Sequence, residues 1–177
     1  MDLWEAIKGR RSIRRYRDEP VDRKLILSII NAARYAPSSR NMQPWEFLVV
    51  QDRETLRRLS EVHQWAWPLR NAPLAIICLA NQELSPRRYL CDVSCAIENM
   101  LLAAYAAGLG ACWIAVHSME DNVVEDKVRE ILSIPKPYRI VAMISVGWPA
   151  EEPKPKSLRP LEEIVHWEKF GSKLANI

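Results

Sequence analysis

The chain has 177 residues, a length that fits one domain with a single large core, because two half-sized domains would each be weakly stabilised. Hydrophobic residues make up 49% and charged residues 27%, which excludes a mainly disordered or collagen-like chain. The net charge of +3 is small. Most of the positive excess lies between Lys8 and Arg17, which favours a local anion site over an extended nucleic-acid surface.

The N-terminal sequence and the cysteines indicate the cellular compartment. The sequence begins MDLWEAIKGR, and its acidic residues are unlike those of a secretory or transit peptide, so we expect a cytosolic protein. The four cysteines (Cys78, Cys91, Cys95 and Cys112) lie in apolar segments without the spacing of a zinc site, and we expect them to be reduced and buried. Cys91 and Cys95 are four residues apart on an expected helix, so a disulfide or metal pair is the alternative.

Helical and strand-like segments alternate along the chain. In chain order we expect helix 2–8, helix 22–33, strand 47–50, helix 54–62, strand 74–79, helix 87–107, strand 112–116, helix 118–132 and strand 140–146. Gly9 is placed to end the first helix, and Asp22 can cap the second. Ser118 and Asp121 resemble a capping box for the fifth. This order predicts a layered mixed α/β domain, with a sheet that is covered by helices.

The fourth expected helix and the end of the chain have unusual compositions. The helix is rich in alanine and apolar on most faces, so we expect it to be buried nearly all round. The uncharged run 100–116 approaches the length of a membrane span, but two glycines near its middle favour a buried helix followed by a buried strand. After Gly147 the sequence becomes rich in proline, which predicts an extended arm ending in a short amphipathic piece, 161–170.

Two polar clusters are candidates for binding. Residues 10–16 (RRSIRRY) hold four arginines and a serine, and guanidinium groups match phosphate oxygens in pairs. The alternative is a solvated basic turn, although Ile13 and Tyr16 among the charges favour a packed segment. Residues 36–45 (APSSRNMQPW) form a proline-bounded loop that either offers side chains to a polar ring edge or is an ordinary turn. No G-x-G-x-x-G joins a strand to a helix, so any nucleotide-like cofactor must be held in another way.

Five separated segments together resemble the nitroreductase-like FMN-dependent flavoenzymes over nearly the whole chain. They are RRSIRRY, APSSRNMQPW, GLGACWI, IPKPYRIVAMISVGWP and LEEIVHWE. The resemblance implies one domain, 1–177, with an α+β fold of layered α/β/α type and a four-to-five-stranded mixed, largely antiparallel sheet. It also implies a homodimer with one FMN per subunit at the interface, in which the C-terminal arm, about 148–177, packs on the partner subunit.

The resemblance assigns roles to residues that match the family pattern. The implied ligands of the FMN phosphate and ribityl chain are Arg10, Arg11 and Ser12, with Lys156 and Arg159, within a residue or two, as further phosphate ligands. Arg14 and Gln64 are implied at the polar edge of the flavin, and Ile114 and Ala115 at its face or N5. The residues implied to come from the other subunit are Pro37, Ser38, Ser39 and Asn41. A cation at Arg14 would stabilise the anionic reduced flavin and raise its potential.

The implied activity is a ping-pong reaction in which NADH or NADPH delivers hydride and a small planar acceptor, such as a nitroaromatic or a quinone, then takes it. We assign no catalytic role to any side chain, because the three histidines stand isolated in sequence, and we expect no metal, nucleic-acid or membrane partner. The chain is shorter than the better-known bacterial nitroreductases between the third and fourth helices. Trp65, Trp67 and Tyr89 then either form a lid or make core or dimer contacts.

Three other functions stay open from the sequence. A flavoenzyme of the same fold can carry out reductive dehalogenation or the oxygen-dependent breakdown of flavin. The basic segment also fits a non-enzymatic module that binds an anionic partner or nucleic acid. A structural dimer without a cofactor is the third.

Overall fold

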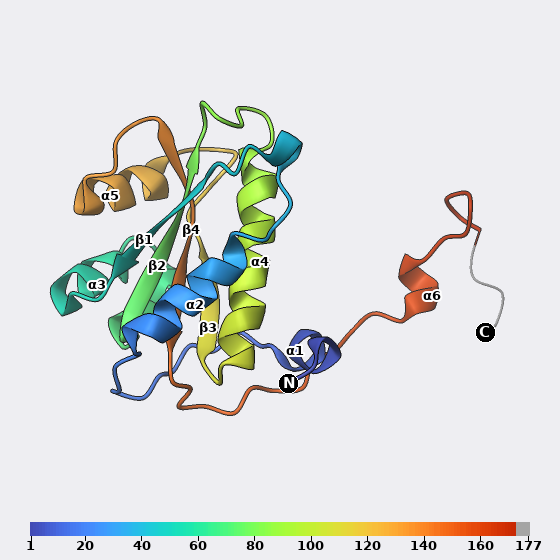
Figure 1. The fold of residues 1–177 in the computed structure, drawn as a ribbon, viewed down its shortest axis with the longest axis horizontal. Coiled ribbons are helices and arrows are strands. Elements are labelled where there is room, and N and C mark those ends of the chain that lie inside the picture. The colour runs from blue at the N-terminus through green and yellow to red at the C-terminus, as the bar shows by residue number, and fades with distance from the viewer. Residues whose placement is uncertain (173–177) are drawn as a thin grey trace.

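The computed structural model describes residues 1–172 of the chain. Its elements, in chain order, are α1 (Leu3–Gly9), α2 (Arg23–Ala33), η1 (Ser39–Asn41), β1 (Trp45–Val50), α3 (Arg53–Leu59), η2 (Gln64–Arg70), β2 (Leu74–Asn81), α4 (Tyr89–Ala106), β3 (Gly110–Ala115), α5 (Val123–Leu132), β4 (Tyr138–Gly147) and α6 (Leu161–Ile164), where η marks a 3-10 helix (Figure 1). All four expected strands and all five expected helices are present, with shifted ends.

The four strands form one sheet in the order β1-β2-β4-β3, and every neighbouring pair is antiparallel. The predicted α+β fold is therefore confirmed, with four strands and no parallel pair among them. β2 and β4 occupy the centre, whereas β3 is an edge strand that pairs only with β4. The edge position of β3 matters for the site, because one side of its backbone remains without a strand neighbour.

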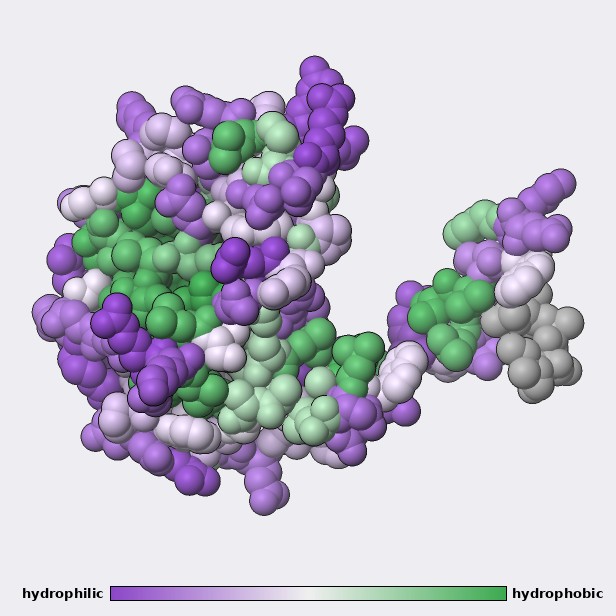
Figure 2. All heavy atoms as spheres, viewed as in Figure 1, coloured by the Kyte–Doolittle hydropathy of each residue, from purple (hydrophilic) through white to green (hydrophobic). Residues whose placement is uncertain are grey.

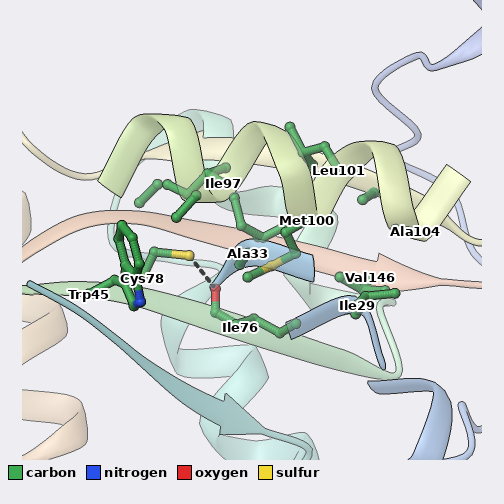
Figure 3. Close-up of a cluster of buried hydrophobic side chains, with 14 of the residues drawn as sticks. Ile29, Ala33, Trp45, Ile76, Cys78, Ile97, Met100, Leu101, Ala104 and Val146 are labelled. Atoms are coloured by element: carbon green, nitrogen blue, oxygen red, sulfur yellow. Dashed lines mark hydrogen bonds between the residues drawn. The ribbon is translucent and has the colours of Figure 1, made fainter. Parts of the chain in front are cut away.

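Helices cover both faces of the sheet. Side chains alternate along a strand, so Leu74, Ile76 and Cys78 of β2 face α2 and α4, where they join the core that includes Ile97 and Met100 (Figure 3). The intervening residues of β2 face the other core, under α3, η2 and α5. Because both faces are buried, β2 is apolar from Leu74 to Ala80. The layered arrangement expected from the sequence is confirmed.

The long helix α4 is not buried all round, so that prediction was wrong. Its residues toward the sheet and α2 are buried, but Cys91, Cys95 and Glu98 are exposed. Spacings of four and three residues place these three side chains on one stripe of the helix. The expectation that all four cysteines are buried was therefore wrong for two of them, and all four thiols are free. No other described element covers this stripe.

The predicted helix ends were right at Asp22 and at Gly9 and wrong at Ser118. Asp22 accepts a hydrogen bond from the Lys24 N–H, as a cap does. Gly9 is the last residue of α1, and a Cβ there would lie 2.1 Å from the Tyr105 hydroxyl, so it permits close packing. Ser118 accepts from the N–H groups of residues 120 and 121 in a turn, and α5 begins only at Val123.

The C-terminal arm leaves the body of the molecule and carries α6 away from it (Figure 1). Only residues 161–164 of the predicted amphipathic piece are helical. Leu158, Leu161 and Ile164 of the arm are exposed, and Figure 2 shows this apolar surface apart from the rest of the chain. Among residues 1–172, no helix has both the length and the apolar character to cross a membrane.

Candidate functional site

A cavity of about 520 Å³ lies beside the open edge of β3. Its lining includes four of the predicted site residues, Arg14, Gln64, Ile114 and Ala115, together with Trp65, Trp67, Trp113, Cys112, Val116, His63, His117, Ser118 and Val124. The β3 cavity thus combines one cation and one amide with several aromatic and apolar side chains. Such a composition is typical of a site for a flat organic ligand.

The backbone of β3 contributes to this cavity because the strand lies at the edge of the sheet. Its outer edge is covered at the start, where Ser12 bridges Ala111 and the Ile13 N–H donates to the Ala111 carbonyl at 3.0 Å. Past Ala111, no described strand pairs with that edge. Ala115, at the end of β3, is exposed. An unpaired strand edge presents N–H and C=O groups to a ligand.

The basic segment is packed, as Ile13 and Tyr16 suggested, with 6% and 8% of these side chains exposed. The Tyr16 hydroxyl contacts the Ser145 hydroxyl at 2.7 Å, and burial raises the pKa of Tyr16 so that it stays protonated. The Glu151 carboxylate accepts from the N–H groups of Arg14 at 2.6 Å and Arg15 at 3.1 Å. The segment therefore lies fixed between the sheet and the start of the arm, which excludes a solvated turn.

The arginines of this segment point to different places. Arg14 lines the β3 cavity. The Arg10 guanidinium lies 3.5 Å from the Glu98 carboxylate on α4. Arg11 donates to the carbonyls of residues 8 and 10 at the end of α1, and it lines a separate cavity of about 280 Å³. Within one chain, the structure does not bring Arg10, Arg11 and Ser12 into the cavity that contains Arg14.

The second predicted cluster forms a strained loop. Arg40, Asn41 and Gln43 all have positive φ, at 51°, 56° and 47°, a conformation that costs free energy for residues other than glycine. The Ser39 N–H donates to the buried Asp92 carboxylate at 2.9 Å, and the Ser85 hydroxyl donates to its other oxygen at 2.7 Å. Sequence reasoning missed Asp92, which fixes the loop to the first turn of α4. Such strain is typical of functional loops.

Within one chain, the loop and the basic segment lie near different ends of α4. The loop is bound to Asp92 in the first turn of the helix, whereas the cavity of Arg11 includes Tyr105 near its last turn. Thirteen residues of helix separate these two points by about 20 Å. Pro37, Ser38, Ser39 and Asn41 are all absent from the lining of the β3 cavity.

The predicted arm residues are also remote from the cavity in the same chain. Lys156 and Arg159 are exposed on the arm, which stands away from the body (Figure 1). Arg159 lies 3.3 Å from the carboxylate of Glu163, which follows four residues later. Four of the thirteen predicted residues therefore share one cavity, and the other nine lie elsewhere in the described chain.

Two histidines that the sequence left without a role also line the β3 cavity. His63 Nδ1 accepts from the Trp65 N–H at 3.1 Å, so the proton of the neutral ring lies on Nε2. His117 Nδ1 lies 3.4 Å from the Arg139 guanidinium, which can only donate, so its ring has the same tautomer. Burial lowers the pKa of both rings, and Arg139 lowers that of His117 further. Both imidazoles are therefore neutral at neutral pH.

A buried carboxylate supports the same wall. Glu125 on α5 is 2% exposed and accepts from Arg129 at 2.9 Å, from Arg139 at 2.9 Å and from the Ile140 N–H at 3.0 Å. Burial by itself raises the pKa of Glu125, but these hydrogen bonds and the two positive charges outweigh burial and leave the pKa below its usual value. The four-residue spacing of Glu125 and Arg129 is the signal in the sequence that indicates this ion pair on one face of a helix.

The chain matches the model of the nitroreductase family over residues 7–89 and 68–148. It belongs to the nitroreductase family. A candidate NADH dehydrogenase/NAD(P)H nitroreductase of Methanothermobacter thermautotrophicus is 42% identical over 96% of this chain and 88% of its own. The NADH dehydrogenase of Thermus thermophilus is 32% identical over 94% of this chain and 96% of its own. An FMN-dependent nitroreductase from Clostridium difficile superposes with a TM-score of 0.87 at 36% identity, over 95% of this chain and all of that one.

Proposed function

We propose that the chain is one subunit of a homodimeric, FMN-dependent oxidoreductase, which takes hydride from NADH or NADPH and passes it to a small planar acceptor such as a nitroaromatic or a quinone. The observation that carries this proposal is the β3 cavity, where Arg14, Gln64 and the exposed end of β3 meet. Membership of the nitroreductase family supports it, as do relatives whose names include NAD(P)H nitroreductase and FMN-dependent nitroreductase.

The residues of the cavity fit a flavin. Its volume of about 520 Å³ is within the range of small-molecule sites, and indole groups and aliphatic side chains match a flat ring system. The Gln64 amide can both donate to and accept from the polar edge of such a ring. The open edge of β3 adds backbone groups, and Arg14 adds the positive charge that a reduced flavin requires.

When bound, FMN supplies the atom that accepts and then donates hydride, so the protein needs no nucleophile. Arg14 lines the cavity and would supply a positive charge beside a bound flavin, which would lower the free energy of its negatively charged reduced state. Trp65 and Trp67 line the cavity and offer aromatic faces to a planar substrate. His63 and His117 are neutral, so they add hydrogen-bonding groups to the wall without changing its charge.

The dimer in this proposal is supported by the separation of the predicted residues. If one FMN contacts both Arg11 and the loop at 38–43, the loop would come from a second chain, because within one chain the two lie near opposite ends of α4. The exposed stripe of α4 and the apolar residues of the arm are surfaces that a second copy would cover. Lys156 and Arg159 would then reach the partner's site.

Absorbance spectroscopy tests the proposal directly. The purified protein, as isolated or after addition of FMN, is expected to show flavin bands that NADH or NADPH bleaches under anaerobic conditions. Addition of a nitroaromatic or a quinone is then expected to restore the bands. A colourless protein that FMN does not reconstitute would contradict the proposal. Restoration only by a halogenated aromatic, or loss of the flavin ring itself in air, would identify a different chemistry on the same fold.

A further inference from the structure

A second cavity, of about 670 Å³, adjoins the β3 cavity, and Trp67 lines both. Arg15, Arg53, Asp18 and Asn71 also line it, so it is more polar than the first. None of these four residues has a part in the proposed flavin site. Two neighbouring cavities with a shared aromatic wall suit a ligand that has two parts of different chemistry.

Arg53 is held at this cavity by its side chain, and Arg15 by its backbone. The Arg53 Nη1 donates to the Ala72 carbonyl at 3.1 Å, and 58% of the side chain is exposed. The backbone of Arg15 is held on both sides, because its N–H donates to the Glu151 carboxylate and its carbonyl accepts from the Ala150 N–H at 2.9 Å. Arg53 has one carboxylate nearby, that of Asp18 at 4.0 Å, and both arginines line the cavity.

The charges of the lining favour an anion. Two arginines and one aspartate, Asp18, line the cavity, and Asp18 is fully exposed and lies 4.0 Å from Arg53. An exposed pair at that distance is weak, so it leaves Arg53 able to bind another anion. Arginine binds phosphate groups through two parallel hydrogen bonds, and an indole face stacks on planar rings.

We propose that this Arg15–Arg53 cavity binds the adenosine phosphate half of NADH or NADPH while the nicotinamide half reaches toward the flavin of the adjoining β3 cavity. The inference rests on the proposed function, which requires a reduced nicotinamide as substrate. The pyrophosphate of that substrate carries the negative charges that the two arginines match, and NADPH carries a further phosphate. Trp67, between the two cavities, offers its ring to the ribose or the adenine.

The segment itself separates this site from the flavin site. Arg14 and Arg15 are consecutive residues, yet Arg14 lines the first cavity and Arg15 the second. Successive side chains of extended backbone point to opposite sides, which explains the division. One short segment thus serves two anionic groups, and substitution of Arg15 is expected to spare FMN binding.

The test uses the FMN-loaded protein and three electron donors. NADH and NADPH contain the adenosine phosphate half, whereas reduced nicotinamide riboside lacks it and carries no phosphate. Rates of flavin reduction are measured for the wild type, Arg15→Ala, Arg53→Ala and the double variant. Arg58→Ala is the matched control, because Arg58 is exposed on the same helix as Arg53 and lines a different cavity. The double variant is expected to lose about tenfold or more in kcat/KM for NADH and NADPH.

The riboside separates the possible results. With this donor, all variants are expected to stay within about twofold of the wild type, since the missing half cannot contact the arginines. Equal losses with NADH and the riboside, no loss with either, or release of FMN from the variants would each overturn the inference. Because Arg53 also bonds to Ala72, Arg15→Ala alone provides the result if Arg53→Ala is unstable. A wild type that oxidises none of the three donors would instead contradict the proposed function.

Discussion

Arg14 differs from its neighbours in the basic segment because its guanidinium lines the β3 cavity. A positive charge there favours the reduced flavin over the oxidised one. Replacement of Arg14 by alanine is expected to lower the midpoint potential of bound FMN, by about 30 mV or more, where 30 mV corresponds to about 1.4 kcal/mol for two electrons. Spectroelectrochemistry of the holoprotein measures this change.

Arg17→Ala is the control for Arg14→Ala. Arg17 belongs to the same segment, but it donates to the Pro149 carbonyl and does not line the cavity. Its replacement is expected to leave the potential unchanged. Equal potentials for wild type and Arg14→Ala would mean that the guanidinium does not lie near the part of the flavin that becomes charged.

The lowered pKa of Glu125 predicts that the stability of the fold depends on pH. Its pKa is lowered in the folded chain from the ordinary 4.5, so its stabilising contribution is complete above that value and is lost as the pH falls through the lower, folded pKa. Glu125→Gln leaves Arg129 and Arg139 without their carboxylate and is expected to cost about 3–5 kcal/mol at pH 7. The variant is also expected to lose less stability in acid than the wild type.

Urea unfolding at pH 7 and below pH 4 measures both effects. Glu130→Gln, at an exposed position of the same helix, is the control and is expected to change the free energy of unfolding by less than about 0.5 kcal/mol. A Glu125→Gln protein as stable as the wild type at pH 7 would show that the buried ion pairs contribute no net stability.

At the scale of elements, the strained loop depends on α4. Asp92 accepts hydrogen bonds from Ser39 and Ser85, so Asp92→Ala leaves both donors without their acceptor. We expect a loss of about 1–3 kcal/mol in stability, faster amide exchange over residues 38–43 and weaker FMN binding. Hydrogen exchange and FMN titration measure the last two. Ser85→Ala removes one of the two bonds and is expected to have a smaller effect on each.

If exchange over residues 38–43 is as slow in Asp92→Ala as in the wild type, then the carboxylate does not hold the loop. If the loop loosens while FMN binding is unchanged, then the loop does not contact the flavin. The two measurements therefore separate the structural role of Asp92 from the proposed role of the loop in the site.

Much of the element order could be predicted from the sequence because the strands are buried apolar runs. The run 74–79 lies within β2, and 140–146 lies within β4. The polar ends of strands were missed, as at Arg139, because that side chain pairs with Glu125 across 14 residues. The start of α5 was missed because the Ser118 hydroxyl serves a turn in place of a helix cap.

The candidate site could be predicted only in part, for a similar reason. The residues that meet in the β3 cavity come from three distant segments, and only the pairing of β3 with β4 and the packing of η2 bring them together. Local patterns carry no such long-range information. His63 was overlooked because its role depends on capping η2, a 3-10 helix that contains Pro68 and has no regular periodicity. The resemblance to the nitroreductase family identified candidate site residues that periodicity alone does not indicate.

The proposed flavin site requires two chains. The basic segment and the loop at 38–43 lie apart within one chain, and the arm extends away from its own body (Figure 1). A symmetric pair of chains would form two equal sites, each with the basic segment of one chain and the loop of the other. Each site would then also receive the arm of the partner.

Complementation between two defective chains tests this claim most directly. One chain carries Arg14→Ala and the other Asn41→Ala, and each alone is expected to form dimers with two impaired sites. When differently tagged copies are co-expressed, the mixed dimer is expected to hold one site with both lesions and one intact site. Random pairing makes half of the dimers mixed, so about a quarter of the wild-type sites is expected to recover. Mixed dimers, isolated by their two tags, with no more activity than either parent would contradict a flavin site shared between two chains.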